Sequence, residues 1–448
     1  MSKNVVENMT PKQIVEYLDR YVIGQGNAKR VIAIALRNRW RRMQLDETMA
    51  QEVTPKNILM IGSTGIGKTE IARRLAKMMS LPFVKVEASK YTEVGFVGRD
   101  VESMIRDLAM ESLALVKKEE AENNKEKIEA YVENKIIEKL LPPLPKGASE
   151  EKLADYDRAF AKKQEQFAKG ELDHLKIEID VAEMSFDIAS SPNVPPDVAE
   201  VQESIIKVIG GMNKKKKKEV SVKDAKKILA SEAARELLNE EELKTKALER
   251  ARSGGIIFID EIDKIAVSAN SSSRQDPSKE GVQRDLLPIV EGSSVKTKIG
   301  QLDTDHILFI AAGAFHLSKP SDLIPELQGR FPLRVELDSL DKEALYRILT
   351  EPANSLINQY KALLGVEGVE VEFSEEALRA LAEYSALANE KTEDIGARRL
   401  HTVMERLLED LSFEADSKSG EKVVIEKELV DEKLGSLVES EDSTRYIL

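Results

Sequence analysis

The chain contains no cysteine among its 448 residues and only four histidines. Without cysteine it can form neither a disulfide nor a thiolate zinc site. It also lacks a cysteine nucleophile and a His-Glu-x-x-His helix, so no motif marks a proteolytic centre, although a Ser-Lys dyad stays open. If proteolysis is the outcome, we expect another chain to supply it.

Aromatic residues, long apolar runs and positive charge are also scarce. Aromatic residues make up 5% of the chain, with one Trp. No apolar run approaches about twenty residues and the first residues form no apolar signal region, so we expect no membrane span and a cytoplasmic location. The net charge is −13, from 67 basic and 80 acidic residues. This balance argues against a nucleic-acid partner, because phosphate contacts need a basic surface.

Against these absences stands a phosphate-binding loop at residues 62–69, Gly-Ser-Thr-Gly-Ile-Gly-Lys-Thr. It follows an apolar strand predicted at 57–61 and precedes a predicted helix. Glycines let backbone N–H groups approach phosphates, and a helix N-terminus favours anions. Lys68 is therefore predicted to reach the β- and γ-phosphates, and Thr69 to bind magnesium. The alternative is an ordinary glycine-rich turn before a helix.

Two acids far along the chain complete this pattern. Four apolar residues at 256–259 precede Asp260 and Glu261, which places both acids at the carboxyl end of a buried strand. Open α/β sheets bind ligands at that edge. Asp260 is predicted to hold magnesium and Glu261 to act as the general base on the attacking water. Helix-capping acids at an ordinary strand end are the alternative, but the pairing with the loop favours ATP hydrolysis.

The halves of this site are separated by a long, charge-dense segment. Alternating charge signs and scarce glycine predict a helical insertion domain at 111–250, within which the five-lysine run 214–218 is expected to be a disordered loop tip. Strands alternate with helices around it, which predicts an α/β fold with a mostly parallel, three-layer sheet. We expect a nucleotide-binding domain at 1–110 plus 251–337, and a smaller, mainly helical domain at 338–448.

Three shorter motifs each allow two interpretations. Gly-Phe-Val-Gly at 95–98 is either a gripping loop that presents Phe96 to a polypeptide or a tight turn with Phe96 in a core. Residues 325–331 are predicted on a loop after the last strand. There Arg330 is either a surface arginine or a group that stabilises transition-state charge on a neighbouring chain's γ-phosphate. Residues 396–400 are predicted to open a helix with an arginine near the nucleotide.

Taken together, these segments resemble a known family. Residues 21–25, the phosphate loop, 257–261, Gly329-Arg330 and 396–399 are similar, in that order, to the AAA+ ATPases of the Clp group. The insertion, Ala35 to Arg42, Gly95 to Gly98 and the ending Arg-Tyr-Ile-Leu narrow the resemblance to the HslU (ClpY) family. The resemblance covers essentially the whole chain.

The resemblance implies an AAA+ ATPase and chaperone of the stress response. It would form a homohexameric ring with a central pore, and would use ATP and Mg²⁺ to pull unfolded or tagged proteins into a docked HslV peptidase. It also implies the following site residues: Val22 and Ile23 for adenine; Gly65, Ile66, Gly67, Lys68, Thr69 and Glu70 for the phosphates; Arg398 as the nucleotide sensor; Arg330 as a finger into the neighbouring subunit, with Glu326 close by; Phe96 and Val97 for gripping substrate; and Tyr446, Ile447 and Leu448 for docking on the peptidase.

The sequence departs from the family pattern at two places, and rival families fit it less well. Phe96 stands where the family commonly has Tyr, and the strand ending Ala311-Ala312 lacks the usual polar sensor, so no residue is assigned to that role. A ClpX-like unfoldase would have a four-cysteine zinc module and an Ile-Gly-Phe loop, and this chain has neither. The charge of −13 opposes a DNA-remodelling ATPase. Intact Lys68, Asp260 and Glu261 oppose a non-catalytic scaffold.

Overall fold

The computed structural model describes residues 9–42, 44–53, 56–93, 99–142, 150–182, 215–237, 240–267 and 277–439. The chain divides into two compact units. The first contains Met1–Leu108, Ala251–Val295 and Asp303–Leu448, and the second contains Ala109–Arg250 and Lys296–Leu302. The three-domain division expected from the sequence remains a proposal.

The first unit is built on a five-stranded parallel sheet. Its spatial order is β2 (Phe83–Glu87), β5 (Ile256–Asp260), β8 (Leu308–Gly313), β1 (Ile58–Ile61) and β9 (Leu333–Glu336). Parallel strands place all their carboxyl ends at one edge. Only one strand, β8, lies between β1 and β5 in this sheet. The loop after β1 and the acids that end β5 are therefore close together at that edge.

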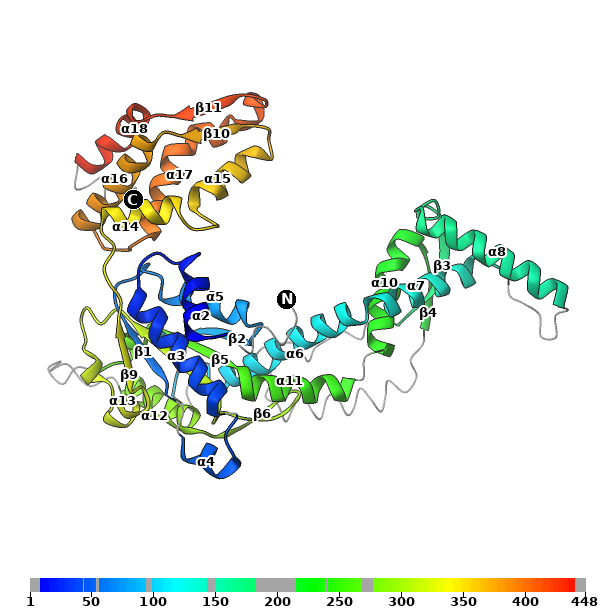
Figure 1. Ribbon diagram of the computed structural model, residues 1–448, viewed down its shortest axis with the longest axis horizontal. Coiled ribbons are helices and arrows are strands. Elements are labelled where there is room, and N and C mark those ends of the chain that lie inside the picture. The colour runs from blue at the N-terminus through cyan, green and yellow to red at the C-terminus, as the bar shows by residue number, and fades with distance from the viewer. Residues whose placement is uncertain are drawn as a thin grey trace. The chain divides into compact units, whose positions relative to one another are not determined.

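Helices cover the sheet because its strands are apolar on both faces. The helices α2 (Pro11–Asp19), α3 (Gly26–Arg42) and α5 (Lys68–Met78) lie beside the sheet (Figure 1). Their apolar side chains form one core with alternate strand residues. The strand residues on the other face are buried too: Leu59, Ile257, Ile259, Phe309 and Ala311. The predicted α/β fold with a parallel, layered sheet is confirmed.

Further elements of the first unit complete this layer. They are the helices α4 (Glu47–Glu52), α12 (Pro277–Glu291) and α13 (Pro325–Arg330) and the short 3₁₀ turns Ala88–Lys90, Ile262–Lys264 and Pro320–Asp322. The strands β6 (Ser294–Thr297) and β7 (Gly300–Asp303) form a hairpin, of which Lys296–Leu302 belong to the second unit. The segment 325–331, expected on a loop after the last strand, is instead mostly the helix α13, and β9 follows it. Proline at the first helical position and the apolar anchor Leu327 explain this helix.

The C-terminal part of the first unit has its own apolar core. Its elements are α14 (Lys342–Thr350), α15 (Leu356–Gly365), β10 (Glu370–Phe373), α16 (Glu375–Lys391), α17 (Arg398–Phe413), β11 (Lys422–Ile425) and α18 (Lys427–Glu439). Side chains of Asp341, Ser355 and Ser374 cap three of these helices. The strands β10 and β11 pair in parallel.

The second unit is mainly helical but contains a hairpin. The helices are α6 (Ser103–Asn123), α7 (Lys125–Leu140), α8 (Glu150–Ala168), α10 (Val222–Leu237) and α11 (Glu240–Gly254). The strands β3 (Lys176–Ala182) and β4 (Lys215–Ser221) pair antiparallel. The prediction that the five-lysine run is a loop tip is therefore wrong, because Lys215 to Lys218 lie in β4. Ile177 and Ile179 of β3 pack on α7 and α10 and anchor the hairpin.

Within this second unit α6 and α11 run side by side (Figure 1). Arg250 donates two hydrogen bonds to the Glu119 carboxylate, at 2.5 and 2.7 Å. The buried hydroxyl of Ser112 donates to the carbonyl oxygen of Ala247 at 2.7 Å. Apolar side chains of both helices are buried as well, among them Leu113 and Leu243. Polar contacts between the two helices therefore add to apolar packing. No described helix is long and apolar enough to cross a membrane.

Candidate functional site

The site begins with the turn between β1 and α5. Gly65 has φ +77° and Gly67 has φ +101°, a left-handed conformation that side chains disfavour. Gly67 is also the residue before α5, and no side chain caps the amides of the first helical turn. These N–H groups are therefore available to an anion at the positive end of the helix dipole.

Lys68 is buried in this loop. Its Nζ donates to the carbonyl oxygens of Gly62 and Ser63, the second at 2.6 Å. Burial lowers the pKa of Lys68, while the charge of Asp260 acts in the opposite direction. An ammonium group held this way has little solvation to lose when it turns to a phosphate oxygen, which suits the predicted role.

The predicted magnesium ligands, Thr69 and Asp260, lie together. The Thr69 hydroxyl is 3.5 Å from Asp260 Oδ2, and the ammonium of Lys85 forms an ion pair with the same oxygen at 2.8 Å. No group of three or more potential His, Asp or Glu ligands exists among the described residues. A hydroxyl and one carboxylate fit Mg²⁺ that is also held by nucleotide phosphates and water. The Asp260 carboxylate already attracts the ammonium of Lys85, which supports its fit to a metal cation.

Glu261 has a left-handed backbone, with φ 57°, which is rare for a residue with a side chain. Its Oε2 accepts a hydrogen bond of 2.9 Å from the hydroxyl of Ser89, which lies in the 3₁₀ turn after β2. Sequence reasoning did not identify Ser89. Its only signal was its position, two residues beyond the end of the strand that neighbours β5.

We expect Ser89→Ala to lower kcat for ATP about tenfold with KM unchanged, because the lost hydrogen bond orients Glu261 and does not contact nucleotide. Steady-state ATPase kinetics measure both constants. Ser89→Thr, which keeps the hydroxyl, serves as the matched control and should restore kcat. A rise in KM that accompanies the fall in kcat, or an equal defect in Ser89→Thr, would contradict the positioning role.

A cavity of about 590 Å³ joins these groups to the C-terminal core. The phosphate loop, Asp260 and Glu261 line it, together with apolar residues that include the predicted adenine contacts Val22 and Ile23. The full lining is Tyr21, Val22, Ile23, Thr64, Gly65, Ile66, Gly67, Lys68, Thr69, Glu70, Arg73, Asp260, Glu261, Ile348, Pro352, Asn354, Ser355, Leu356, Gln359, Ala397, Arg398, Leu400 and His401. Its size and its mixed polar and apolar lining fit a nucleotide.

The phosphate loop is in direct contact with the turn before α17. The amide of Ala397 donates to the carbonyl oxygen of Gly65 at 3.2 Å. Of the two arginines that follow, Arg398 lines the cavity. Arg399 is buried and bonds to Asn389, Thr392 and the carbonyl oxygen of Glu393. The structure therefore separates two neighbouring arginines, one beside the cavity and one that holds the turn together.

Glu70, at the start of α5, lines the cavity and is held by two arginines. Arg73 donates at 2.7 Å and Arg74 at 2.6 Å to its Oε1. Burial raises the pKa of Glu70, but the hydrogen bonds from Arg74 and Arg73 more than offset this and leave the pKa below its usual range. Its carboxylate stays charged and fixed beside the cavity.

Glu326 and Arg330 do not line this cavity. Both lie on α13, where the exposed Arg330 forms an ion pair of 2.9 Å with Glu291. The predicted roles of these two residues toward a neighbouring subunit remain predictions.

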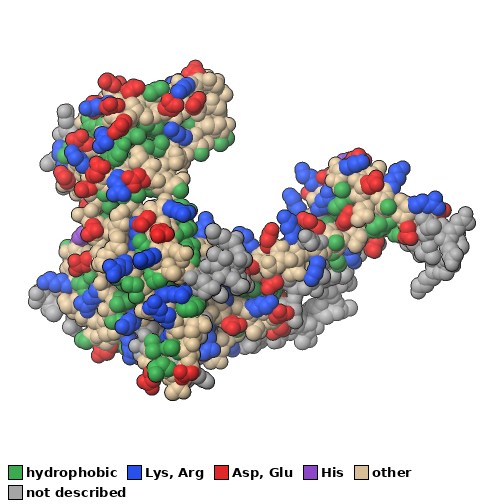
Figure 2. Space-filling view, in the orientation of Figure 1, with side chains coloured by type: hydrophobic (Ala, Val, Ile, Leu, Met, Phe, Trp, Pro, Cys, Tyr) green, Lys and Arg blue, Asp and Glu red, His purple; other side chains and the backbone are tan. Residues whose placement is uncertain are grey.

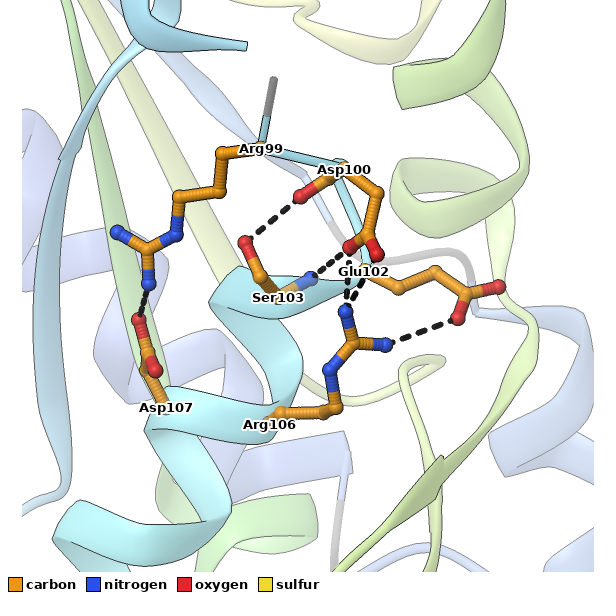
Figure 3. A network of polar contacts seen from close by, with 6 residues as sticks. All are labelled: Arg99, Asp100, Glu102, Ser103, Arg106 and Asp107. Carbon is orange, nitrogen blue, oxygen red and sulfur yellow. Dashed lines mark hydrogen bonds and ion pairs between the residues drawn. The ribbon is translucent and has the colours of Figure 1, made fainter. Parts of the chain in front are cut away.

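The gripping residues Phe96 and Val97 lie outside the described residues, but the segment that follows them is described (Figure 3). The Asp100 carboxylate accepts from the amide of Ser103 at 2.8 Å and from Arg106 at 2.6 Å. Arg99 pairs with Asp107. These contacts fix the start of α6 directly after residues 94–98. Tyr446, Ile447 and Leu448 also lie outside the described residues.

Comparisons with known proteins agree with this geometry. A family model described as "ATPase family associated with various cellular activities (AAA)" matches residues 58–143, and "AAA domain (Cdc48 subfamily)" matches residues 182–334. The chain is 64% identical over 98% of its length to the ATP-dependent protease ATPase subunit HslU of Campylobacter jejuni, all of which is covered. It is 63% identical over 98% of its length to the protein of the same name from Helicobacter pylori, 99% of which is covered.

Proposed function

The chain belongs to the HslU family of ATPase subunits of ATP-dependent proteases, and on that premise we propose that it unfolds protein substrates and feeds them to a separate HslV-type peptidase, which it activates. It is an AAA ATPase and binds nucleotide. The observation that carries the proposal is the convergence of Lys68, Thr69, Asp260 and Glu261 on one cavity that the C-terminal core helps to line.

For the chemical step we propose that Lys68 and the first amides of α5 hold the β- and γ-phosphates. Glu261 takes the proton of the attacking water, and the hydroxyl of Ser89 holds the carboxylate in position. Thr69 and Asp260 hold Mg²⁺, which neutralises phosphate charge when bound. Val22 and Ile23 enclose the base. Arg398 lines the same cavity and acts as the nucleotide sensor of the C-terminal core.

For the assembly we propose a cytoplasmic homohexamer around a central pore. Arg330, with Glu326 beside it, acts on the nucleotide of the next subunit, and Phe96 and Val97 grip the substrate. Tyr446 to Leu448 dock on the peptidase. The relatives' name, ATPase subunit of an ATP-dependent protease, supports a peptidase partner, as does the absence of any cysteine nucleophile from this chain.

We expect Phe96→Ala to keep basal ATP turnover and to lower degradation of a folded protein about tenfold or more, because an aromatic side chain supplies most of the apolar grip. Both rates are measured with an HslV-type peptidase present and absent, with casein as an unfolded comparison. Phe96→Tyr is the matched control and should retain degradation. Unimpaired degradation by the Ala variant, or no degradation by the unmodified pair, would overturn the proposal.

A further inference from the structure

A second cavity, of about 270 Å³, lies at the opposite edge of the sheet from the nucleotide cavity. It is formed at the amino ends of β8 and β9 by the end of α3 and the segment that follows. Its lining is Ala35, Asn38, Arg39, Arg41, Arg42, Leu45, Val53, Lys56, His306, Ile307, Leu308 and Leu333. No acidic side chain lines it among the described residues. In Figure 2, Lys and Arg side chains gather on the face that carries α3.

Two of the arginines around this cavity, Arg39 and Arg41, bond to neutral oxygens. Arg39 donates to the carbonyl oxygens of Gly255 and Arg252, at 3.0 and 3.3 Å, and Arg41 donates to Asn38 Oδ1 at 2.9 Å. Carbonyl and amide dipoles satisfy N–H groups without cancelling their charge. The cavity therefore stays electropositive in a protein whose net charge is −13.

Two further observations on Arg39 indicate that the cavity suits an anion. The Arg39 Nε is buried and has no hydrogen-bond partner. Burial, with the charge of Arg42, lowers the pKa of the Arg39 guanidinium to about 9. Most buried donors are paired, and a buried cation is normally matched by an opposite charge. The charge of Asp305 acts on Arg42 and His306, whereas for Arg39 the causes are burial and the charge of Arg42.

The residues that line the cavity indicate what kind of anion would fit. Ile307, Leu308 and Leu333 line it from the strands, and Leu45 and Val53 extend the apolar surface outward. The imidazole of His306 is 2.7 Å from Arg42 Nη1 through its Nδ1, so Nδ1 is the acceptor and Nε2 carries the proton. Apolar walls with a basic rim match a molecule that has an anionic head and an apolar body. The volume limits that molecule to a small one.

We propose that this cavity is a binding site for a small amphiphilic anion, a carboxylate or phosphate on a short apolar body. The cations of the rim contact the head and the strand residues contact the body. The site is separate from the nucleotide cavity and does not depend on the proposed function.

The test is calorimetric titration of the full chain, saturated with ADP to block the nucleotide cavity, with octanoate as the probe. We expect about one octanoate per chain, bound about tenfold more tightly than acetate or octanamide. Acetate lacks the apolar body, and octanamide lacks the negative charge. The exposed rim pair is changed in Arg41→Gln with Lys56→Gln, which should weaken octanoate binding about tenfold.

The matched control is Lys342→Gln with Lys361→Gln, which removes the same charge from exposed positions of α14 and α15. It should bind octanoate within about twofold of the unmodified chain, since its charges are remote from the cavity. Thermal midpoints check that both double variants are folded. Absence of octanoate binding, equal binding of octanamide, or equal loss in the two double variants would overturn the proposal.

Discussion

Glu261→Gln is expected to reduce ATP hydrolysis by about 100-fold or more while nucleotide binding changes little, because loss of a general base typically costs that much. Glutamine has nearly the same shape and can still accept the hydrogen bond from Ser89, so the left-handed backbone at this position is undisturbed. It cannot take a proton from water. The contacts of Lys68, Thr69 and Asp260 are unchanged, so binding survives.

Two measurements separate these effects: fluorescence titration with a labelled ATP, and phosphate release in single-turnover conditions. Glu87→Gln is the matched control, because Glu87 ends the neighbouring strand in register with Asp260 and does not line the cavity. That variant should hydrolyse ATP normally. Turnover by Glu261→Gln at a rate near that of the unmodified chain would show that another group acts as the base.

The parts of the site that the sequence could predict are those set by local geometry. A short apolar strand, a glycine-rich turn and a helix place Lys68 and Thr69 without reference to the rest of the chain. Asp260 and Glu261 end an apolar strand, and parallel strands bring their ends to one edge. These predictions therefore needed only the neighbouring residues in the sequence.

The groups that sequence reasoning missed depend on which strands become neighbours. Lys85 and Ser89 reach Asp260 and Glu261 only because β2 pairs with β5 across the whole insertion. Nothing in the residues around 85–89 indicates that partner. In the same way Asn354, Gln359 and His401 line the cavity because the C-terminal core lies against the phosphate loop.

The lysine run shows how composition can mislead. Five successive lysines have no apolar alternation and a large self-repulsion, which normally favours disorder. In the structure Lys215 to Lys218 belong to β4, whose partner β3 carries the apolar residues that anchor the hairpin. The pairing partner lies about forty residues earlier, so a local pattern cannot predict the strand.

Gly65→Ala is expected to lower ATP affinity by about 100-fold or more, because the phosphate loop and the C-terminal core touch through backbone at this residue. A Cβ atom at position 65 would lie 2.0 Å from the carbonyl oxygen of Ile395 and 2.9 Å from its carbonyl carbon. The φ of +77° adds about 1–2 kcal/mol of strain. No side-chain rotation relieves an overlap with backbone.

The two segments must therefore separate. On the other side Gly396 is also close to backbone, since a Cβ there would lie 2.6 Å from the carbonyl oxygen of Thr64. Separation breaks the bond from Ala397 to Gly65 and withdraws Arg398 from the cavity, so both the phosphate amides and the sensor arginine lose their positions.

Gly420→Ala is the control that isolates this overlap from backbone strain. Gly420 also has a left-handed φ, +85°, but nothing lies within 4 Å of a Cβ atom placed there. Both variants should lose stability from the strained φ, and Gly65→Ala should show the larger decrease in thermal midpoint because its two segments also separate. Only Gly65→Ala should lose ATP affinity in fluorescence titration. If the two variants bound ATP equally well, the contact between the phosphate loop and the turn before α17 would have no part in holding the nucleotide.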